Sequence, residues 1–406
     1  MSASQQPTFV ERQLFGQFCT ALERASTYST AVRKLNQMFP TEFSAGVKRE
    51  RSANRPCSIY PMVRLLIPDA DRERNTYGVK IKNLTDIFIN KLMQLTQESG
   101  AAMRIRHYKN PNYGGASSRY GSGGSSAAGD FALVLEQELA KRRAGVGGTI
   151  TIGEVNAQLN LLAQAVGMPA RLSVMQTLYD AMSANELKWI VRIILKNMTI
   201  GLKKNAVLRD YHEDAPDYYD ACNNLKKVLD ELTDPKQRMT QRIELYQTFT
   251  PMLAKRDRDL NVATIFAKTH DFIVEPKYDG ERIVCHWDST AHGGAGEVKL
   301  FTRNANDYTE MYGAALLPWL RRSCKCDKAV LDGEMMSWDN VLHRFGNFGH
   351  NKTVMREQAA WERSGRWTRT ASADGRVSYA NASTGQVSFI YRFIYANHAH
   401  NLTRSP

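Results

Sequence analysis

The chain has 406 residues, 43% of them hydrophobic and 23% charged, which is ordinary for globular domains and favours two or three of them. Lys and Arg exceed Asp and Glu by 54 − 41 = 13, so the surface favours polyanions; nucleic acid and the ribosome both fit this charge. No apolar run has the length of a membrane helix, and the N-terminus has no secretory core, so we expect no membrane partner. The six scattered cysteines form no disulfide framework, and we assign no metal to Cys324-Lys325-Cys326.

The first 250 residues have apolar side chains at helical spacing and several helix start signals. Asp130 can cap a helix that runs FALVLEQELAKRR. Thr151 with Glu154, and Ser183 with Glu186, have the spacing of capping boxes at two further helix starts. The basic stretch VKRERSANRP at 47–56 is interpreted as a solvated loop, with a nuclear targeting signal as the alternative. We therefore predict an all-helical domain over residues 1–250.

Two features modify this helical domain. Residues 110–129 are rich in Gly and Ser and predict a flexible insertion between helices. Basic side chains gather around 192–204, but helix surfaces commonly carry such residues, so we expect each to be solvated. They are Arg192, Lys196, Lys203 and Lys204.

After about Thr250 the pattern changes from helical to strand-like, and residues 271–287 read DFIVEPKYDGERIVCHW. One interpretation is a β-hairpin that turns at Asp279-Gly280. The other is an active site of the form K-x-D-G-x-R with Lys277 as nucleophile. A lysine amine attacks only when neutral, which burial or a nearby cation such as Arg282 would favour.

Two later stretches favour the active site. Arg303 ends a strand-like run in FTRNANDYT, and Asp332 and Glu334 lie in the strand-like AVLDGEMM. This order of motifs, with their spacing, resembles the ATP-dependent DNA ligases, and in particular the ligase IV branch, which joins DNA ends in the eukaryotic nucleus. The resemblance implies that Lys277 attacks the α-phosphate of ATP, that the adenylate then moves to a DNA 5′-phosphate, and that a 3′-hydroxyl displaces AMP.

The resemblance also assigns the remaining site residues. It implies that Glu275, Pro276 and Tyr278 line the nucleotide pocket, and that Arg282 and Arg303 orient ribose, phosphate or the DNA 5′-phosphate. Glu334 would bind a ribose hydroxyl and Mg²⁺, which prefers oxygen ligands. Asp279 and Asp332 have a structural role as an equal alternative.

The fold class that follows is multidomain, α and then α+β. An all-helical DNA-binding domain at 1–250 precedes a partial adenylation domain at 251–406, with a mixed, largely antiparallel sheet. Later family motifs are not recognisable after about Glu357, so 358–406 lack clear family character; Phe389 and Phe393 are candidates for the aromatic residue that stacks on adenine.

The resemblance implies duplex DNA ends or nicks as substrate, ATP and Mg²⁺ as cofactors, and a nuclear location. A coiled-coil scaffold protein is the partner of the family, but we find no region for binding it, and no OB-fold. We therefore expect the chain alone not to seal DNA. The alternatives are a non-catalytic duplex-DNA-binding module and an RNA-directed nucleotidyltransferase, such as a capping enzyme or RNA ligase.

Overall fold

The computed structural model describes residues 6–53, 55, 57–110, 129–239, 243–251, 277–339 and 344–345. Farther on it describes short strands at 367–371, 377–381, 387–388, 390–395 and 400–401. The chain divides into two compact units, one of residues 1–219 and 224–240, the other of residues 220–223 and 241–406. We call them the helical unit and the sheet unit. Glu275 and Pro276, and residues 111–128 of the predicted insertion, lie outside the described residues.

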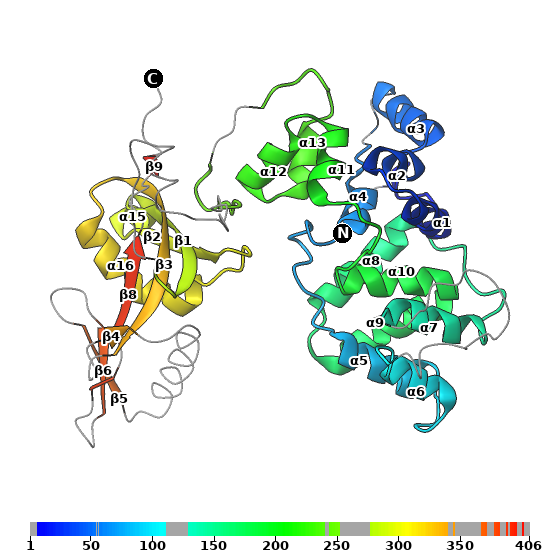
Figure 1. Ribbon diagram of the computed structural model, residues 1–406. Helices are drawn as coiled ribbons and strands as arrows, with labels where there is room; N and C mark the ends of the chain where they lie inside the picture. The colour runs from blue at the N-terminus through cyan, green and yellow to red at the C-terminus, as the bar shows by residue number, and fades with distance from the viewer. Residues whose placement is uncertain are drawn as a thin grey trace, which may run out of the picture. The chain divides into compact units, whose positions relative to one another are not determined.

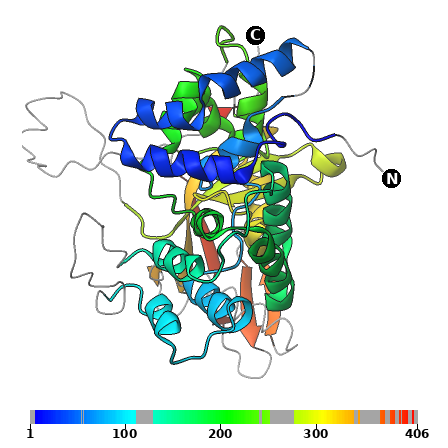
Figure 2. The same ribbon diagram turned by 90° about the vertical axis from the view of Figure 1, so that its right-hand side faces the viewer.

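The helical unit is built from helices along its whole described length (Figure 1). Their bounds are α1 Phe15–Thr27, α2 Ala31–Met38, α3 Thr41–Ser52, α4 Tyr60–Leu66, α5 Ile81–Asp86, the π-helix η1 Ile87–Leu92, α6 Gly100–Arg106, α7 Phe131–Ala140, α8 Ile152–Gln164, α9 Gly167–Ala181, α10 Ala184–Ile194, α11 Lys204–Tyr211, α12 Ala215–Cys222 and α13 Leu225–Glu231. The helices α1, α2 and α3, drawn in blue, follow one another along one side of the unit (Figure 2).

The predicted helix starts are confirmed. The Asp130 carboxylate accepts a hydrogen bond from the Leu133 N–H at 3.1 Å, which caps α7. Both capping boxes form, at Thr151 before α8 and at Ser183 before α10. The predicted loop at 47–56 is wrong in its first half, since α3 continues to Ser52. The polar side chains of this stretch are solvated on a helix instead. The buried, apolar Val47 anchors that helix.

Helix α10 lies in the core of the helical unit, in contact with α1 and α7. Apart from Asn185, every residue of α10 is buried, as expected for a helix packed on all sides. The buried cations on it are paired: Lys188 bonds Glu23 and Glu136, and Arg192 bonds Asp130 at 2.7 Å. The expectation that Arg192 is solvated is therefore wrong, because this side chain is 9% exposed and tied to the start of α7.

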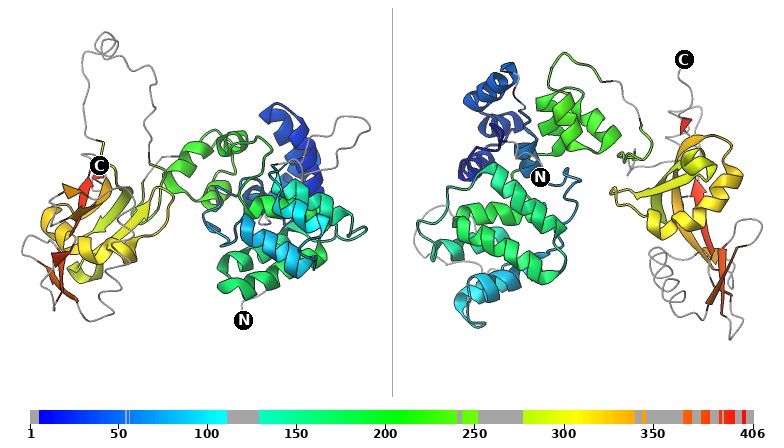
Figure 3. Two further views of the ribbon diagram at one scale, coloured as in Figure 1. Left: turned by 60° about the horizontal axis from the view of Figure 1, so that its bottom comes forward. Right: turned by 180° about the vertical axis from the view of Figure 1, so that it is seen from behind.

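The sheet unit contains antiparallel strands in the order β2-β1-β3-β4, and β8 and β9 also pair with β3. Its strands are drawn in yellow to red in Figure 3. Every strand pair described is antiparallel. The elements are β1 Glu281–Asp288, α15 Ala291–Gly294, β2 Glu297–Thr302, α16 Thr309–Ser323, β3 Lys328–Asp339, β4 Arg344–Phe345, β5 Trp367–Ala371, β6 Val377–Asn381, β7 Val387–Ser388, β8 Ile390–Tyr395 and β9 His400–Asn401. Strands β5, β6 and β7 form a second small sheet.

One face of the main sheet packs against α16. Alternate residues of β1, namely Ile283, Cys285 and Trp287, point to this face and lie in one core with Tyr312 and Leu320 of α16. On the other face His286 is fully buried, and its Nδ1 accepts the Tyr246 N–H at 3.0 Å. The sheet therefore packs against other parts of the sheet unit on both faces of β1.

Candidate active site

The strand register brings the three sequence motifs to one edge of the sheet. Ile283 of β1 lies opposite Thr302 of β2 and opposite Gly333 of β3. Because β1 runs antiparallel to both β2 and β3, the start of β1 and the ends of β2 and β3 meet at this edge. Arg303 follows β2 directly, and Glu334 lies directly opposite Arg282. Residues far apart in the sequence therefore surround the segment that carries Lys277.

Gly280 allows that segment to approach β3 closely. Its N–H donates to Glu334 Oε1 at 3.1 Å. A Cβ atom at Gly280 would lie 2.5 Å from the Met335 carbonyl oxygen and 2.7 Å from Met336 Cγ, so no larger residue fits. Gly280 has no positive φ, unlike the glycine of a type I′ hairpin turn. The glycine of the motif thus serves close packing, and the first half of the alternative hairpin, before Lys277, lies outside the described residues.

Arg282 is held by Asp332 through two contacts. Its Nε donates to Asp332 Oδ1 at 2.9 Å, and its Nη2 donates to Asp332 Oδ2. This hydrogen bonding raises the pKa of Arg282, so the guanidinium stays charged. The structural role that the sequence left open for Asp332 is therefore specific: it orients the arginine of the motif.

Glu334 lies opposite Arg282 in the register and within electrostatic reach of Lys277. Burial raises the pKa of Glu334, while the Gly280 N–H and the charges of Lys277 and Arg282 act in the opposite direction. The Glu334 carboxylate thus feels the positive charges of Lys277 and Arg282, and the Gly280 N–H fixes its position. Lys277, Tyr278 and Asp279 are exposed, so burial is not the means by which this structure would favour a neutral Lys277.

An aromatic pair borders the site. The rings of Tyr278 and Phe345 meet edge to face with centroids 6.3 Å apart, and Phe345 comes from β4, which pairs with β3. Sequence reasoning did not identify Phe345; the only signal was the surrounding FGNFG run. Of the candidate adenine-stacking residues, Phe389 lies outside the described residues, and Phe393 lies opposite Met335 in the register, one position from Glu334.

The carboxylates fit a magnesium ion only together with a bound phosphate. In the described part of the chain, no cluster of three or more His, Cys, Asp or Glu side chains could hold a metal by itself. Magnesium commonly binds through one or two carboxylates and the phosphates of its substrate. Glu334 offers such a carboxylate, whereas Asp332 is engaged with Arg282.

Two models of known families match the chain. The family model "DNA ligase N terminus" matches residues 13–212, and the model "ATP dependent DNA ligase domain" matches residues 251–406. The second match extends through 358–406, where the sequence alone gave no recognisable motif. The chain belongs to the family of ATP-dependent DNA ligases.

Within that family the chain is similar to proteins named DNA ligase 4. It is 35% identical to that of Coprinopsis cinerea over 320 residues, which is 76% of this chain and 30% of the relative. It is 33% identical to that of Arabidopsis thaliana over 301 residues, 74% of this chain and 23% of the relative. It is 30% identical to that of Dictyostelium discoideum over 377 residues, which is 84% of this chain and 32% of the relative. The chain thus spans about a third or less of the length of these relatives.

Proposed function

We propose that this chain carries out the adenylate-transfer chemistry of an ATP-dependent DNA ligase of the ligase 4 type, in the joining of DNA ends in the nucleus. The observation that carries the proposal is the single edge of the sheet that gathers Lys277, Arg282 with Asp332, Arg303 and Glu334. Sealing of duplex ends or nicks is the reaction that this chemistry serves.

The neutral Lys277 amine attacks the α-phosphorus of ATP. A P–N bond forms, the α–β P–O bond breaks, pyrophosphate leaves and the amine loses a proton. An oxygen of the DNA 5′-phosphate then takes the adenylate and frees the lysine. A 3′-hydroxyl finally attacks the 5′-phosphate and AMP leaves.

The remaining residues bind and orient the nucleotide. Arg282 is pre-oriented by Asp332, so its charge meets the phosphates without further reorganisation. Arg303 is exposed on the turn after β2 and is free to meet a phosphate of ATP or DNA. Glu275, Pro276 and Tyr278 form the nucleotide pocket in this proposal. Mg²⁺, when bound at Glu334, neutralises charge at the reacting phosphate.

The helical unit binds the duplex in this proposal, which also includes a coiled-coil scaffold protein as a protein partner. An RNA-directed reaction receives no support from the match of residues 13–212 to a DNA ligase N terminus.

The test is self-adenylylation of the full chain with α-labelled ATP and magnesium. We expect a covalent label in the wild type and none in Lys277→Ala. The matched control is Lys325→Ala, which removes an exposed lysine of the same unit away from the site and should retain the label. Duplex binding without any label would instead support a non-catalytic DNA-binding module.

A further inference from the structure

The segment that carries Lys277 lies just outside the main sheet. Strand β1 begins at Glu281, and the three residues 277–279 that precede Gly280 are exposed. The Gly280 N–H bonds Glu334, but Gly280 is three residues from Lys277, and each residue between them has two soft backbone dihedrals. A contact nearer to Lys277 is that of the Tyr278 ring with the ring of Phe345. This contact is therefore better placed than the Gly280 bond to restrain the amine.

The strand register explains why Phe345 is found beside this segment. Residues 333–335 of β3 pair with β1 on one side and with β8 on the other. Trp338 of β3 pairs with Ile390 of β8 and also with Phe345 of β4. A strand has only two hydrogen-bonding edges, so β4 lies on the same edge of β3 that β1 uses.

Strand β4 thus occupies the edge of β3 beyond the start of β1. Glu281 pairs with Met335, and Phe345 pairs with Trp338, three residues or about 10 Å farther along β3. If β1 extended backwards in the same register, Tyr278 would face Trp338, which is the position that Phe345 holds. The chain before Gly280 must therefore leave the sheet where β4 stands, and Tyr278 meets Phe345 at that point.

The ring contact is at the surface of the site and not in the core. Tyr278 is 37% exposed and Phe345 is half-buried. The rings meet edge to face with centroids 6.3 Å apart, and a pair of this kind shifts an equilibrium by roughly 2- to 10-fold. Because Tyr278 is the next residue after Lys277, a restraint on its ring also restrains the backbone that carries the amine.

From these observations we propose that Phe345 is a positioning residue for adenylate transfer. It holds Tyr278, and through Tyr278 the Lys277 amine, in the orientation from which the amine attacks ATP. Phe345 itself does not touch the reacting atoms. The inference deepens the proposed function and rests on it, since it gives β4 a part in the reaction of Lys277.

The experiment measures single-turnover formation of lysyl-AMP by the full chain over a range of ATP concentrations, which gives a maximal rate and a half-saturating concentration. Phe345→Leu removes the ring and keeps an apolar side chain, whereas Phe345→Tyr keeps a ring. The matched control is Phe249→Leu in the same unit. Phe249 is half-buried, and its ring meets that of His286 edge to face at the same centroid distance of 6.3 Å.

We expect Phe345→Leu to lower the maximal rate per folded molecule by roughly 2- to 10-fold, with the half-saturating ATP concentration unchanged. Phe345→Tyr and Phe249→Leu should keep the wild-type rate. A higher half-saturating concentration would show direct contact with the nucleotide and overturn the positioning role. A wild-type rate per folded molecule in Phe345→Leu, or an equal loss in Phe345→Tyr, would overturn it as well.

A double-mutant cycle tests whether Phe345 acts through Tyr278. Tyr278→Leu should lower the maximal rate, and Phe345→Leu added to it should cause no further loss, because the partner ring is already absent. Losses that multiply would overturn this inference alone. The absence of AMP on Lys277 in the wild type is a different result, and it would overturn the proposed function together with the inference.

Discussion

Asp332 holds Arg282 through a two-point ion pair, with Arg282 Nε 2.9 Å from Asp332 Oδ1. Both side chains are about a third exposed, at 28% and 30%, so the pair lies at the surface of the site and not in the core. A surface pair contributes little to stability. Its effect is on geometry, because two bonds to Asp332 restrain the orientation of the guanidinium beside Glu334.

Asp332→Asn should therefore slow adduct formation without unfolding the sheet unit. We expect a loss of about 10- to 100-fold in the rate, the size associated with a small misplacement of a catalytic group. Arg282→Lys should give a similar loss, because an ammonium cannot bond at two points. The measurement is the rate of lysyl-AMP formation as a function of ATP concentration.

The control for that prediction is Glu310→Gln, which removes an exposed carboxylate in the first turn of α16. A merely structural Asp332 would lower the melting temperature and leave the rate per folded molecule unchanged. Wild-type rates in Asp332→Asn would contradict the orienting role.

Gly280→Ala should disturb both packing and activity. The added Cβ would lie 2.5 Å from the Met335 carbonyl oxygen, which is backbone and cannot move aside easily. Overpacking of this kind costs about 1–3 kcal/mol. The melting temperature and the rate of adduct formation should both fall.

Gly313→Ala provides the matched control within the same unit. Gly313 lies in α16, and a Cβ there would make ordinary contacts at 3.4 and 3.5 Å, so alanine should stabilise the helix by about 0.5–1 kcal/mol. If Gly280→Ala were tolerated as well as Gly313→Ala, close packing would not be the reason for the glycine of the motif.

We expect the stability of the sheet unit to depend on pH through the buried His286. Burial lowers its pKa to about 4, and its Nδ1 accepts the Tyr246 N–H while its ring packs edge to face on Phe249 and Phe301. The folded pKa lies below the unfolded value of about 6.5. Stability is therefore fully present above about pH 6.5 and is lost as pH falls towards the folded pKa, by about 3 kcal/mol in total.

The comparison that isolates this effect is His286→Gln. Glutamine can accept the Tyr246 N–H through its side-chain oxygen but does not titrate. Denaturant unfolding of both proteins at a series of pH values should show the difference growing as pH falls from about 6.5 to about 4. Parallel curves would show that His286 is not the group responsible.

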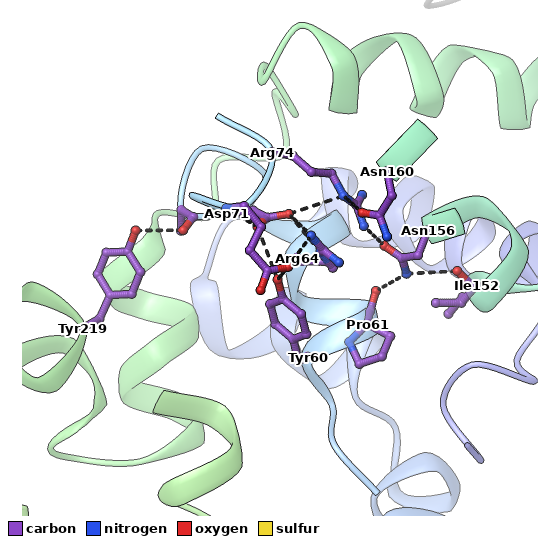
Figure 4. Close-up of polar contacts among 11 residues, drawn as sticks. Tyr60, Pro61, Arg64, Asp71, Arg74, Ile152, Asn156, Asn160 and Tyr219 are labelled. Carbon is purple, nitrogen blue, oxygen red and sulfur yellow. Dashed lines mark hydrogen bonds and ion pairs between the residues drawn. The ribbon is translucent and has the colours of Figure 1, made fainter. Parts of the chain in front are cut away.

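Arg74→Leu should strongly destabilise the helical unit. Arg74 is 1% exposed, and its loss removes the donor to Asn156 Oδ1 and to Asn160 Oδ1 and one of the two cations paired with the Asp71 carboxylate (Figure 4). Breaking a buried charge pair in this way costs about 3–5 kcal/mol. The measurement is thermal unfolding, with Arg55→Ala as control, since Arg55 is 60% exposed in its pair with Glu50 and should change nothing measurable.

Much of this structure could be predicted from local sequence signals. Asp130, Thr151 and Ser183 start helices as expected, because a cap depends only on residues one turn away. The order of motifs likewise predicted that Lys277, Arg303 and Glu334 share a site, because those motifs end or begin strands.

What the sequence did not reveal are contacts between distant residues. The pairing of Arg282 with Asp332, the position of Phe345 beside Tyr278 and the bond of His286 to the Tyr246 backbone all depend on strand register and packing. For the same reason Arg192 was expected in solvent, although it pairs with Asp130.

Within the described residues, no helix has both the length and the apolar character to cross a bilayer.

The central claim is that one amine, that of Lys277, accepts the nucleotide. The most direct measurement is peptide mapping by mass spectrometry of the full chain after incubation with ATP and magnesium. The account predicts a single AMP on the peptide that contains Lys277, and its release when pyrophosphate is added. An unmodified Lys277, or an adduct on another lysine that persists in Lys277→Ala, would contradict it.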